Sequence, residues 1–78
     1  MSTSAARKEA KAISVEFTTD TLKVTLADGR VIAAPLEWFP ILRDATPKQR
    51  NHWRLIGGGI GLHWPDLDED ISIEGLLI

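Results

Sequence analysis

The sequence contains no cysteine, so the chain has neither disulfide bonds nor thiolate ligands for a metal. It has no tyrosine and only two histidines, which leaves few side chains suited to acid–base catalysis near neutral pH. Its longest apolar run is far shorter than the roughly 20 residues that span a bilayer, and its N-terminus lacks the apolar segment of a signal peptide. These absences predict a cytoplasmic, non-enzymatic protein with no cofactor, metal or membrane contact.

What remains is the composition of one small globular domain. The 78 residues are 44% hydrophobic and 26% charged. A chain of this length buries only about 60% of its unfolded surface, so a homodimer or a partner that covers apolar surface would stabilise it. Residues 1–10 are small and polar, which predicts a flexible lead-in, and residues 11–78 are expected to form the single domain.

Charge is unevenly distributed, although the net charge is only −2. Residues 66–74 carry five carboxylates and no cation, whereas Arg43, Lys48, Arg50 and Arg54 make the middle of the chain basic. An acidic chain is a poor candidate for strong nucleic-acid binding, because neutralising phosphates requires clustered lysine and arginine. The basic segment nevertheless leaves nucleic-acid binding as an alternative function.

Three strands are predicted in the first half of the chain. Apolar and polar residues alternate over 13–17 and 22–26, which is typical of strands with one buried face, and residues 30–34 make a third strand that ends at Pro35. Asp28-Gly29, between the last two, favours a two-residue hairpin turn. A meander with these turns pairs the following residues on the buried face: Ile13 with Leu26, Val15 with Val24, Phe17 with Leu22, Leu26 with Val31, and Val24 with Ala33.

Short helices are expected after the meander. Pro40 disfavours helical conformation in the residue before it, so a helical turn is predicted to begin at Pro40. Thr46, Pro47 and Gln49 have the spacing of a capping box with proline in the first helical position. This pattern predicts a helix from Pro47 to about His52.

A hairpin is predicted around the glycine-rich residues 57–61. If Gly58-Gly59 is the turn, Leu55 pairs with Leu62, and Trp53 faces Trp64 on the core side. The same glycines match no phosphate-binding loop, because no Gly-Lys-Ser/Thr sequence follows them.

The remaining residues complete the expected fold. Asp66 is expected to cap a single turn with Glu69 at its third position. Residues 71–73 are expected to form a short strand or an extended segment, and the apolar end 76–78 is expected to dock on the core. The fold class is therefore predicted to be α+β. Its expected parts are a small antiparallel sheet (the three-stranded meander plus a C-terminal hairpin) and one or two short helices.

The acidic run 66–70 is the strongest candidate for a functional surface. Its alternating carboxylates resemble the start of a calcium loop, but that loop needs glycine at position six and glutamate at position twelve, where this chain has Ile71 and Leu77. The run is therefore interpreted either as a solvated turn or as an acidic patch that meets a basic partner. An enzyme that uses His63 with Asp66 or Asp68 is an alternative class, although no nucleophile accompanies them.

The segment 53–77, with its His63-Trp64-Pro65 sequence followed by acidic residues, closely resembles the bacterial domain-of-unknown-function family 2442. The likeness extends over residues 12–77, and further segments fit its pattern: Asp28-Gly29-Arg30, Pro35-Leu36 and Trp38-Phe39-Pro40. The resemblance implies a small α+β domain, found alone or ahead of a helix-turn-helix domain. It implies no catalytic residues. Because family members often lie beside a small companion gene, it also implies an antitoxin-like role.

The leading hypothesis is a non-enzymatic bacterial protein–protein interaction module that neutralises a small basic companion protein. A related alternative is an acidic inhibitor that mimics phosphate and blocks a nucleic-acid enzyme, and a further alternative is a nucleic-acid-binding regulator. An exposed tryptophan supplies the apolar anchor and the carboxylates supply charge complementarity. The residues expected to contact the partner are Trp38, Trp64, Asp66, Asp68, Glu69 and Asp70.

Overall fold

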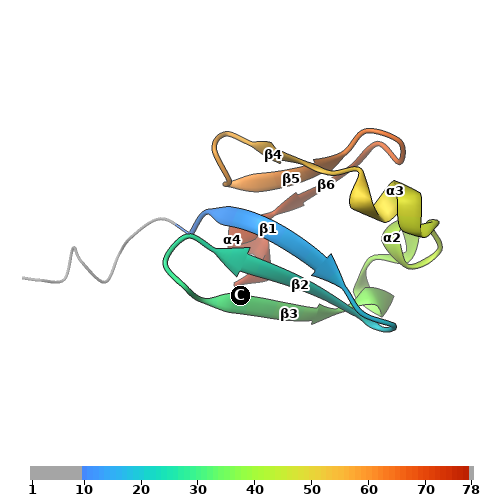
Figure 1. The fold of residues 1–78 in the computed structure, drawn as a ribbon, viewed down its shortest axis with the longest axis horizontal. Coiled ribbons are helices and arrows are strands. Elements are labelled where there is room, and N and C mark those ends of the chain that lie inside the picture. The colour runs from blue at the N-terminus through green and yellow to red at the C-terminus, as the bar shows by residue number, and fades with distance from the viewer. Residues whose placement is uncertain (1–9, 78) are drawn as a thin grey trace, which may run out of the picture.

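The computed structural model describes residues 10–77, which form two three-stranded antiparallel sheets with short helices (Figure 1). Of the expected lead-in, residues 1–9 lie outside the described part. The α+β class is confirmed, and a third strand joins the expected C-terminal hairpin. The elements are β1 (Ala12–Phe17), β2 (Thr21–Leu26), β3 (Val31–Pro35), η1 (Leu36–Trp38), α2 (Pro40–Arg43), α3 (Pro47–Asn51), β4 (Arg54–Ile56), β5 (Gly61–Trp64), β6 (Glu69–Ser72) and α4 (Ile73–Leu76).

The pairing of β1 with β2 follows the prediction at Val15–Val24 and at Phe17–Leu22. It departs from it at the start of β1, where a bulge between residues 12 and 14 places Ala12, not Ile13, opposite Leu26. An extra residue in one strand reverses the alternation of side chains beyond it. The prediction that Ile13 is buried is therefore wrong, and its side chain is 55% exposed.

The loop between β2 and β3 is one residue longer than predicted. The Leu26 N–H donates to the Arg30 C=O at 2.8 Å, so the loop consists of residues 27–29. Gly29 has a φ of +97°, the left-handed conformation that closes a three-residue loop with a bulge. The Asp28 side chain accepts from the backbone N–H of Arg30 at 3.0 Å, and this bond holds the turn.

The longer loop changes which face each β3 residue occupies. Val24 pairs with Ile32, and Leu22 pairs with Ala34, in place of the predicted partners. A shift of one residue exchanges the two faces of a strand. The predicted burial of Val31 is therefore wrong, and 55% of that residue is exposed.

The two predicted helices after the meander are confirmed. α2 begins at Pro40, and α3 begins at Pro47 and ends one residue before the expected boundary. Thr46 Oγ1 accepts from the Gln49 N–H at 3.1 Å, and the Thr46 N–H donates to Gln49 Oε1 at 3.0 Å. These two bonds complete the predicted capping box.

The predicted register of β4 with β5 is also confirmed, with Leu55 opposite Leu62. Gly57, Gly58 and Gly59 all have positive φ in the turn between them. Gly59 also touches the first sheet, because its C=O accepts from the Ala12 N–H at 2.8 Å. A Cβ at Gly59 would lie 2.7 Å from the Ala12 oxygen, so this close approach of the two sheets requires glycine.

The turn after β5 differs from the prediction. Trp64 pairs with Glu69, so residues 65–68 are a hairpin loop and Glu69 begins a strand rather than completing a capped helical turn. Asp68 has a φ of +51° in this loop, a conformation that aspartate tolerates better than most residues. β6 then leads directly into α4, where Ser72 Oγ accepts from the Gly75 N–H.

The chain end packs only in part against the core. Leu76 contacts the core cluster, whereas Leu77 is 42% exposed and Ile78 lies outside the described residues. Ile73, expected in an extended segment, is the fully buried first residue of α4.

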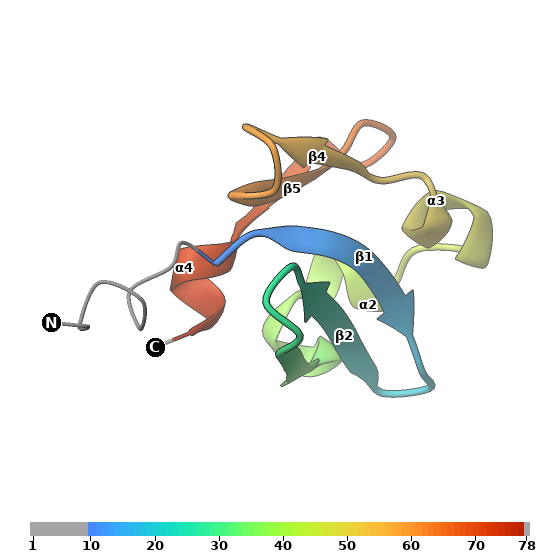
Figure 2. The same ribbon diagram turned by 60° about the vertical axis from the view of Figure 1, so that its left-hand side comes forward.

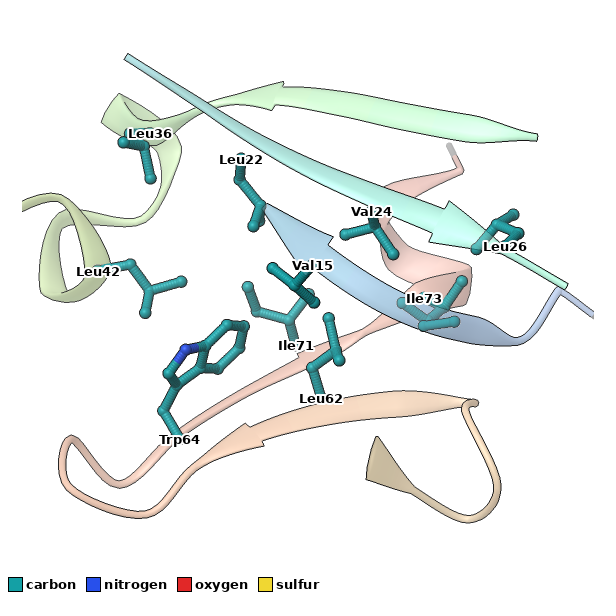
Figure 3. Packing of buried hydrophobic residues seen from close by; sticks show 11 residues of the cluster. Val15, Leu22, Val24, Leu26, Leu36, Leu42, Leu62, Trp64, Ile71 and Ile73 are labelled. Atoms are coloured by element: carbon teal, nitrogen blue, oxygen red, sulfur yellow. The ribbon is translucent and has the colours of Figure 1, made fainter. Parts of the chain in front are cut away.

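The core lies between the two sheets, which face each other with α2 and α3 at one end (Figures 1 and 2). Side chains from β5 and β6 point toward those of β1 and β2, as Figure 3 shows for Trp64, Leu62 and Val15. Because both faces of this interior are apolar, the hydrophobic effect holds the two short sheets together. The buried cluster comprises Ala12, Val15, Leu22, Val24, Leu26, Leu36, Leu42, Leu62, Trp64, Ile71 and Ile73.

Candidate functional site

Trp64 belongs to the core and not to the surface. None of its side chain is exposed, and its Nε1–H donates to the C=O of Arg50 at 2.9 Å. Its ring also meets Phe17 edge-on, with centroids 6.4 Å apart. The expectation that Trp64 contacts a partner is therefore corrected, because in the folded domain its apolar surface and its polar group are both satisfied internally.

Arg50 joins three elements around that tryptophan. Its Nε–H donates to the Leu42 C=O at 2.8 Å, and its Nη2 donates to the Arg43 C=O at 2.6 Å. The guanidinium also lies 5.5 Å from the centroid of the Phe17 ring. These bonds stabilise the C-terminal end of α2, so Arg50 is engaged inside the domain rather than presented to phosphate groups.

One of the other basic side chains of this segment is already paired with a carboxylate. Arg43 is paired with Asp44, whose pKa is lowered by the hydrogen bond from that arginine. Among residues 10–77, Lys48 and Arg54 form no ion pair, but two cations are few for neutralising a nucleic-acid backbone.

Trp38 occupies the position expected of a surface anchor. It is the last residue of η1 and is 67% exposed. Together with Phe39 it lines one side of an open hollow of about 340 Å³, whose other side is formed by β6 and α4. The full lining is Trp38, Phe39, Asp70, Ile71, Ser72, Gly75 and Leu76.

Asp70, the last residue of the acidic run, lies at this hollow. Asp66 and Asp68 are exposed in the β5–β6 loop, Glu69 is half-buried at the start of β6, and Asp70 lines the hollow itself. The sequence contains no lysine or arginine between Pro65 and its C-terminal residue. Asp70 and the exposed Trp38, distant in sequence, are thus brought together at one hollow.

Both histidines pair with carboxylates of the acidic run, which sequence analysis did not find. His52 Nδ1 lies 2.9 Å from Asp66 Oδ2, and His63 Nδ1 contacts Asp70 Oδ1. The cross-strand register of β5 and β6 places His63 directly opposite Asp70. The His63–Asp70 pair can be predicted from the sequence only if β5 and β6 are first recognised as a hairpin. The predicted combination of His63 with Asp66 or Asp68 is not formed.

These pairs do not belong to a metal-ligand cluster in the described part of the chain. No group of three or more histidine, aspartate or glutamate side chains within residues 10–77 could hold a metal ion. Each histidine has one carboxylate neighbour, and neither histidine lines the hollow beside Trp38. Because both carboxylates are exposed to solvent, each pair contributes at most about 1 kcal/mol to stability.

Comparison with known protein families gives one match. The profile of the family "Protein of unknown function (DUF2442)" matches residues 12–77. The chain belongs to this family. The match covers all six strands and both sides of the hollow beside Trp38. No curated protein matches the chain.

Two solved structures are similar to this DUF2442 domain. A crystal structure of a protein of unknown function from Rhodospirillum rubrum is 30% identical with a TM-score of 0.75, and the match covers 90% of this chain and 87% of that one. A solution NMR structure of an uncharacterized protein from Chromobacterium violaceum is 25% identical with a TM-score of 0.75, covering 95% of this chain and 70% of that one. Within residues 10–77, no helix is long and apolar enough to cross a membrane.

Proposed function

We propose that this DUF2442 domain is a non-enzymatic protein–protein interaction module that binds and neutralises a small basic partner, in the manner of an antitoxin. One observation carries the proposal: exposed Trp38 and acidic Asp70 line the same hollow. An aromatic side chain in a concave site is a typical binding hot spot, and neighbouring carboxylates select a cationic partner.

The apolar part of this surface is large enough to anchor a side chain. Trp38, Phe39 and Leu76 border the hollow, and Ile71 forms part of its lining. An exposed tryptophan costs free energy in water, and burying it against a partner would recover much of that cost. Trp38 therefore supplies the apolar contact that Trp64, buried in the core, does not.

The charged part of the surface explains why the partner is basic. Asp68, Glu69 and Asp70 are consecutive in the chain, with no arginine or lysine in the surrounding segment, and Asp70 lines the hollow. Charges at the rim of an interface chiefly raise the association rate and reject partners of like charge. The same charges disfavour nucleic acid as the ligand of this face.

The test begins with affinity capture from a lysate of the native cell, followed by binding measurements with the purified partner. The variant Asp68→Asn/Glu69→Gln/Asp70→Asn removes three charges, and Asn suits the positive φ at position 68. We expect its association rate constant to fall about tenfold at low salt.

A control variant removes three charges elsewhere: Glu16→Gln/Asp20→Asn/Asp44→Asn. It should associate at nearly the original rate, because these carboxylates lie on β1, the β1–β2 turn and the end of α2. An equal fall of the association rate constant in both variants would show that the net charge of the protein sets the rate and that the acidic run has no particular role. A folded acidic-run variant that binds unchanged would refute the proposal.

A further inference from the structure

β6 has a free edge, and the hydrogen-bond pattern shows which backbone groups it presents. The Ile73 N–H donates to the Ile60 C=O at 3.0 Å, so these two residues are a hydrogen-bonded pair. Ser72 opposite Gly61 is the next pair in the same register. In an antiparallel pair, bonded residues alternate with residues whose backbone groups point away from the partner strand. Asp70 and Ser72 therefore direct their backbone groups away from β5.

Those backbone groups have no partner in the part of the chain that the structure describes. β6 is the last strand of its sheet, with only β5 beside it. No hydrogen bond from residues 10–77 reaches the N–H or C=O of Asp70 or the N–H of Ser72, while the Ser72 C=O lies at the N-cap of α4. Two donors and one acceptor thus face the hollow that Asp70, Ile71 and Ser72 line.

We propose that an extended segment of the basic partner adds to this edge as a fourth strand, alongside β6 and against Trp38. This inference rests on the proposed function and specifies how its partner binds. Strand addition uses main-chain hydrogen bonds for affinity and alternate side-chain positions for specificity.

The two faces of the added strand would contact different kinds of side chain, charged on the outer face and apolar on the inner face. A residue opposite Asp70 places its side chain on the outer face of the sheet, where Asp70 and His63 already contact each other. Its neighbours point inward, because side chains alternate along a strand, and there they meet Phe39, Trp38 and Leu76. The segment that fits is therefore apolar, basic and apolar in alternation.

Charge argues against a second copy of this chain as the occupant. Antiparallel pairing of β6 with β6 of another copy would place the two Asp70 side chains opposite each other, or diagonal to each other in the register that aligns Asp70 with Ser72. Like charges opposite each other on neighbouring strands are destabilising, so a cationic segment from another protein is favoured.

The first experiment titrates the labelled protein with a short blocked peptide that alternates valine and lysine, followed by amide NMR. We expect shift changes and slowed hydrogen exchange at the Asp70 and Ser72 amides, and weaker binding by a valine–glutamate peptide. Shifts confined to other surfaces, or no shift at millimolar peptide, would overturn the proposal. Dimer formation without peptide would instead identify a second copy as the occupant and also overturn it.

The second experiment blocks the edge. Ser72→Pro removes the N–H, and the φ of −85° at this position is close to that of proline. Ser72→Ala removes the same side-chain cap of α4 but keeps the backbone N–H. Comparing the two variants therefore separates the loss of the N–H from the loss of the cap. We expect Ser72→Pro to bind the captured partner about tenfold more weakly than Ser72→Ala.

A proline on β3, an edge strand of the first sheet, is the matched control. Leu26 and Arg30 are a hydrogen-bonded pair, and bonded pairs alternate with non-bonded pairs along β2 and β3. Ala33 belongs to a non-bonded pair, so its N–H points away from β2, as the N–H of Ser72 points away from β5. Ala33→Pro should leave partner binding unchanged. If Ser72→Pro binds as well as Ser72→Ala while the acidic-run variant is impaired, strand addition is wrong and the proposed function stands. If neither is impaired, both are wrong.

Discussion

The two sheets of this domain differ in how they use their strands. β1, β2 and β3 have 6, 6 and 5 residues, and each contributes at least one buried side chain. β4, β5 and β6 have 3, 4 and 4 residues, and β4 has no buried residue. The second sheet therefore depends on packing against the first, and it carries the acidic loop and the free β6 edge.

This difference suggests a division between scaffold and binding surface. The strands of the first sheet are longer and supply five residues of the buried cluster, against three from the strands of the second sheet. In the second sheet, short strands leave polar groups beside a hollow, which is unfavourable for stability and useful for binding. If this division holds, substitutions should lower the free energy of unfolding most in the shared core and least at the hollow.

The largest effect is expected at Trp64, the main contact from the second sheet into the shared core. Trp64→Ala removes a fully buried ring and leaves the Arg50 C=O without its donor. We expect the free energy of unfolding to fall by about 3–5 kcal/mol, measured by urea denaturation with circular dichroism. A loss below about 1 kcal/mol would contradict the dependence of the second sheet on this contact.

The next effect is expected at Gly59, where the β4–β5 turn touches β1. Gly59→Ala forces a Cβ against the Ala12 carbonyl and should cost at least about 2 kcal/mol of unfolding free energy. Gly58→Ala is the matched control: it has positive φ but open space around the added Cβ, so about 1 kcal/mol is expected. Equal losses would show that the turn conformation, and not the junction of the sheets, requires glycine.

A smaller, pH-dependent effect is expected at Asp28 in the β2–β3 loop. The backbone N–H of Arg30 lowers the pKa of Asp28 in the folded state. A lowered pKa means that this carboxylate stabilises the fold above its unfolded-state pKa, and that the stabilisation is lost as the pH falls through the folded-state pKa. Asp28→Ala should therefore destabilise the domain at neutral pH and progressively less in acid, as urea unfolding at several pH values would show. A pH-independent difference would refute this.

The smallest effect on stability is expected at Trp38. Because its side chain is largely exposed, Trp38→Ala should change the unfolding free energy by no more than about 0.5 kcal/mol. The same substitution should weaken binding of the captured partner strongly, measured by calorimetry. Destabilisation comparable to that of Trp64→Ala would assign Trp38 to the scaffold and remove it from the binding surface.

The tryptophans illustrate what sequence reasoning could reach in the candidate site. Trp38 and Trp64 each lie beside proline and apolar residues, so local pattern offered no way to tell anchor from core. The structure separates them because β5 directs Trp64 between the sheets, whereas η1 ends at Trp38 on the surface. The pairing of His52 with Asp66, fourteen positions apart in sequence, likewise depends on how α3 meets the β5–β6 loop.

The amino-acid sequence by itself determined the strand-forming segments of the meander, the capping box at Thr46, the register at Leu55–Leu62 and the acidic composition of the β5–β6 loop. These features rest on short-range rules: alternation, capping geometry and glycine turns. Tertiary structure alone decided the bulge that exposes Ile13, the three-residue loop at Gly29, and the meeting of Trp38 with β6 beside one hollow. These depend on how two sheets pack around one core, an energy shared among residues far apart in the chain.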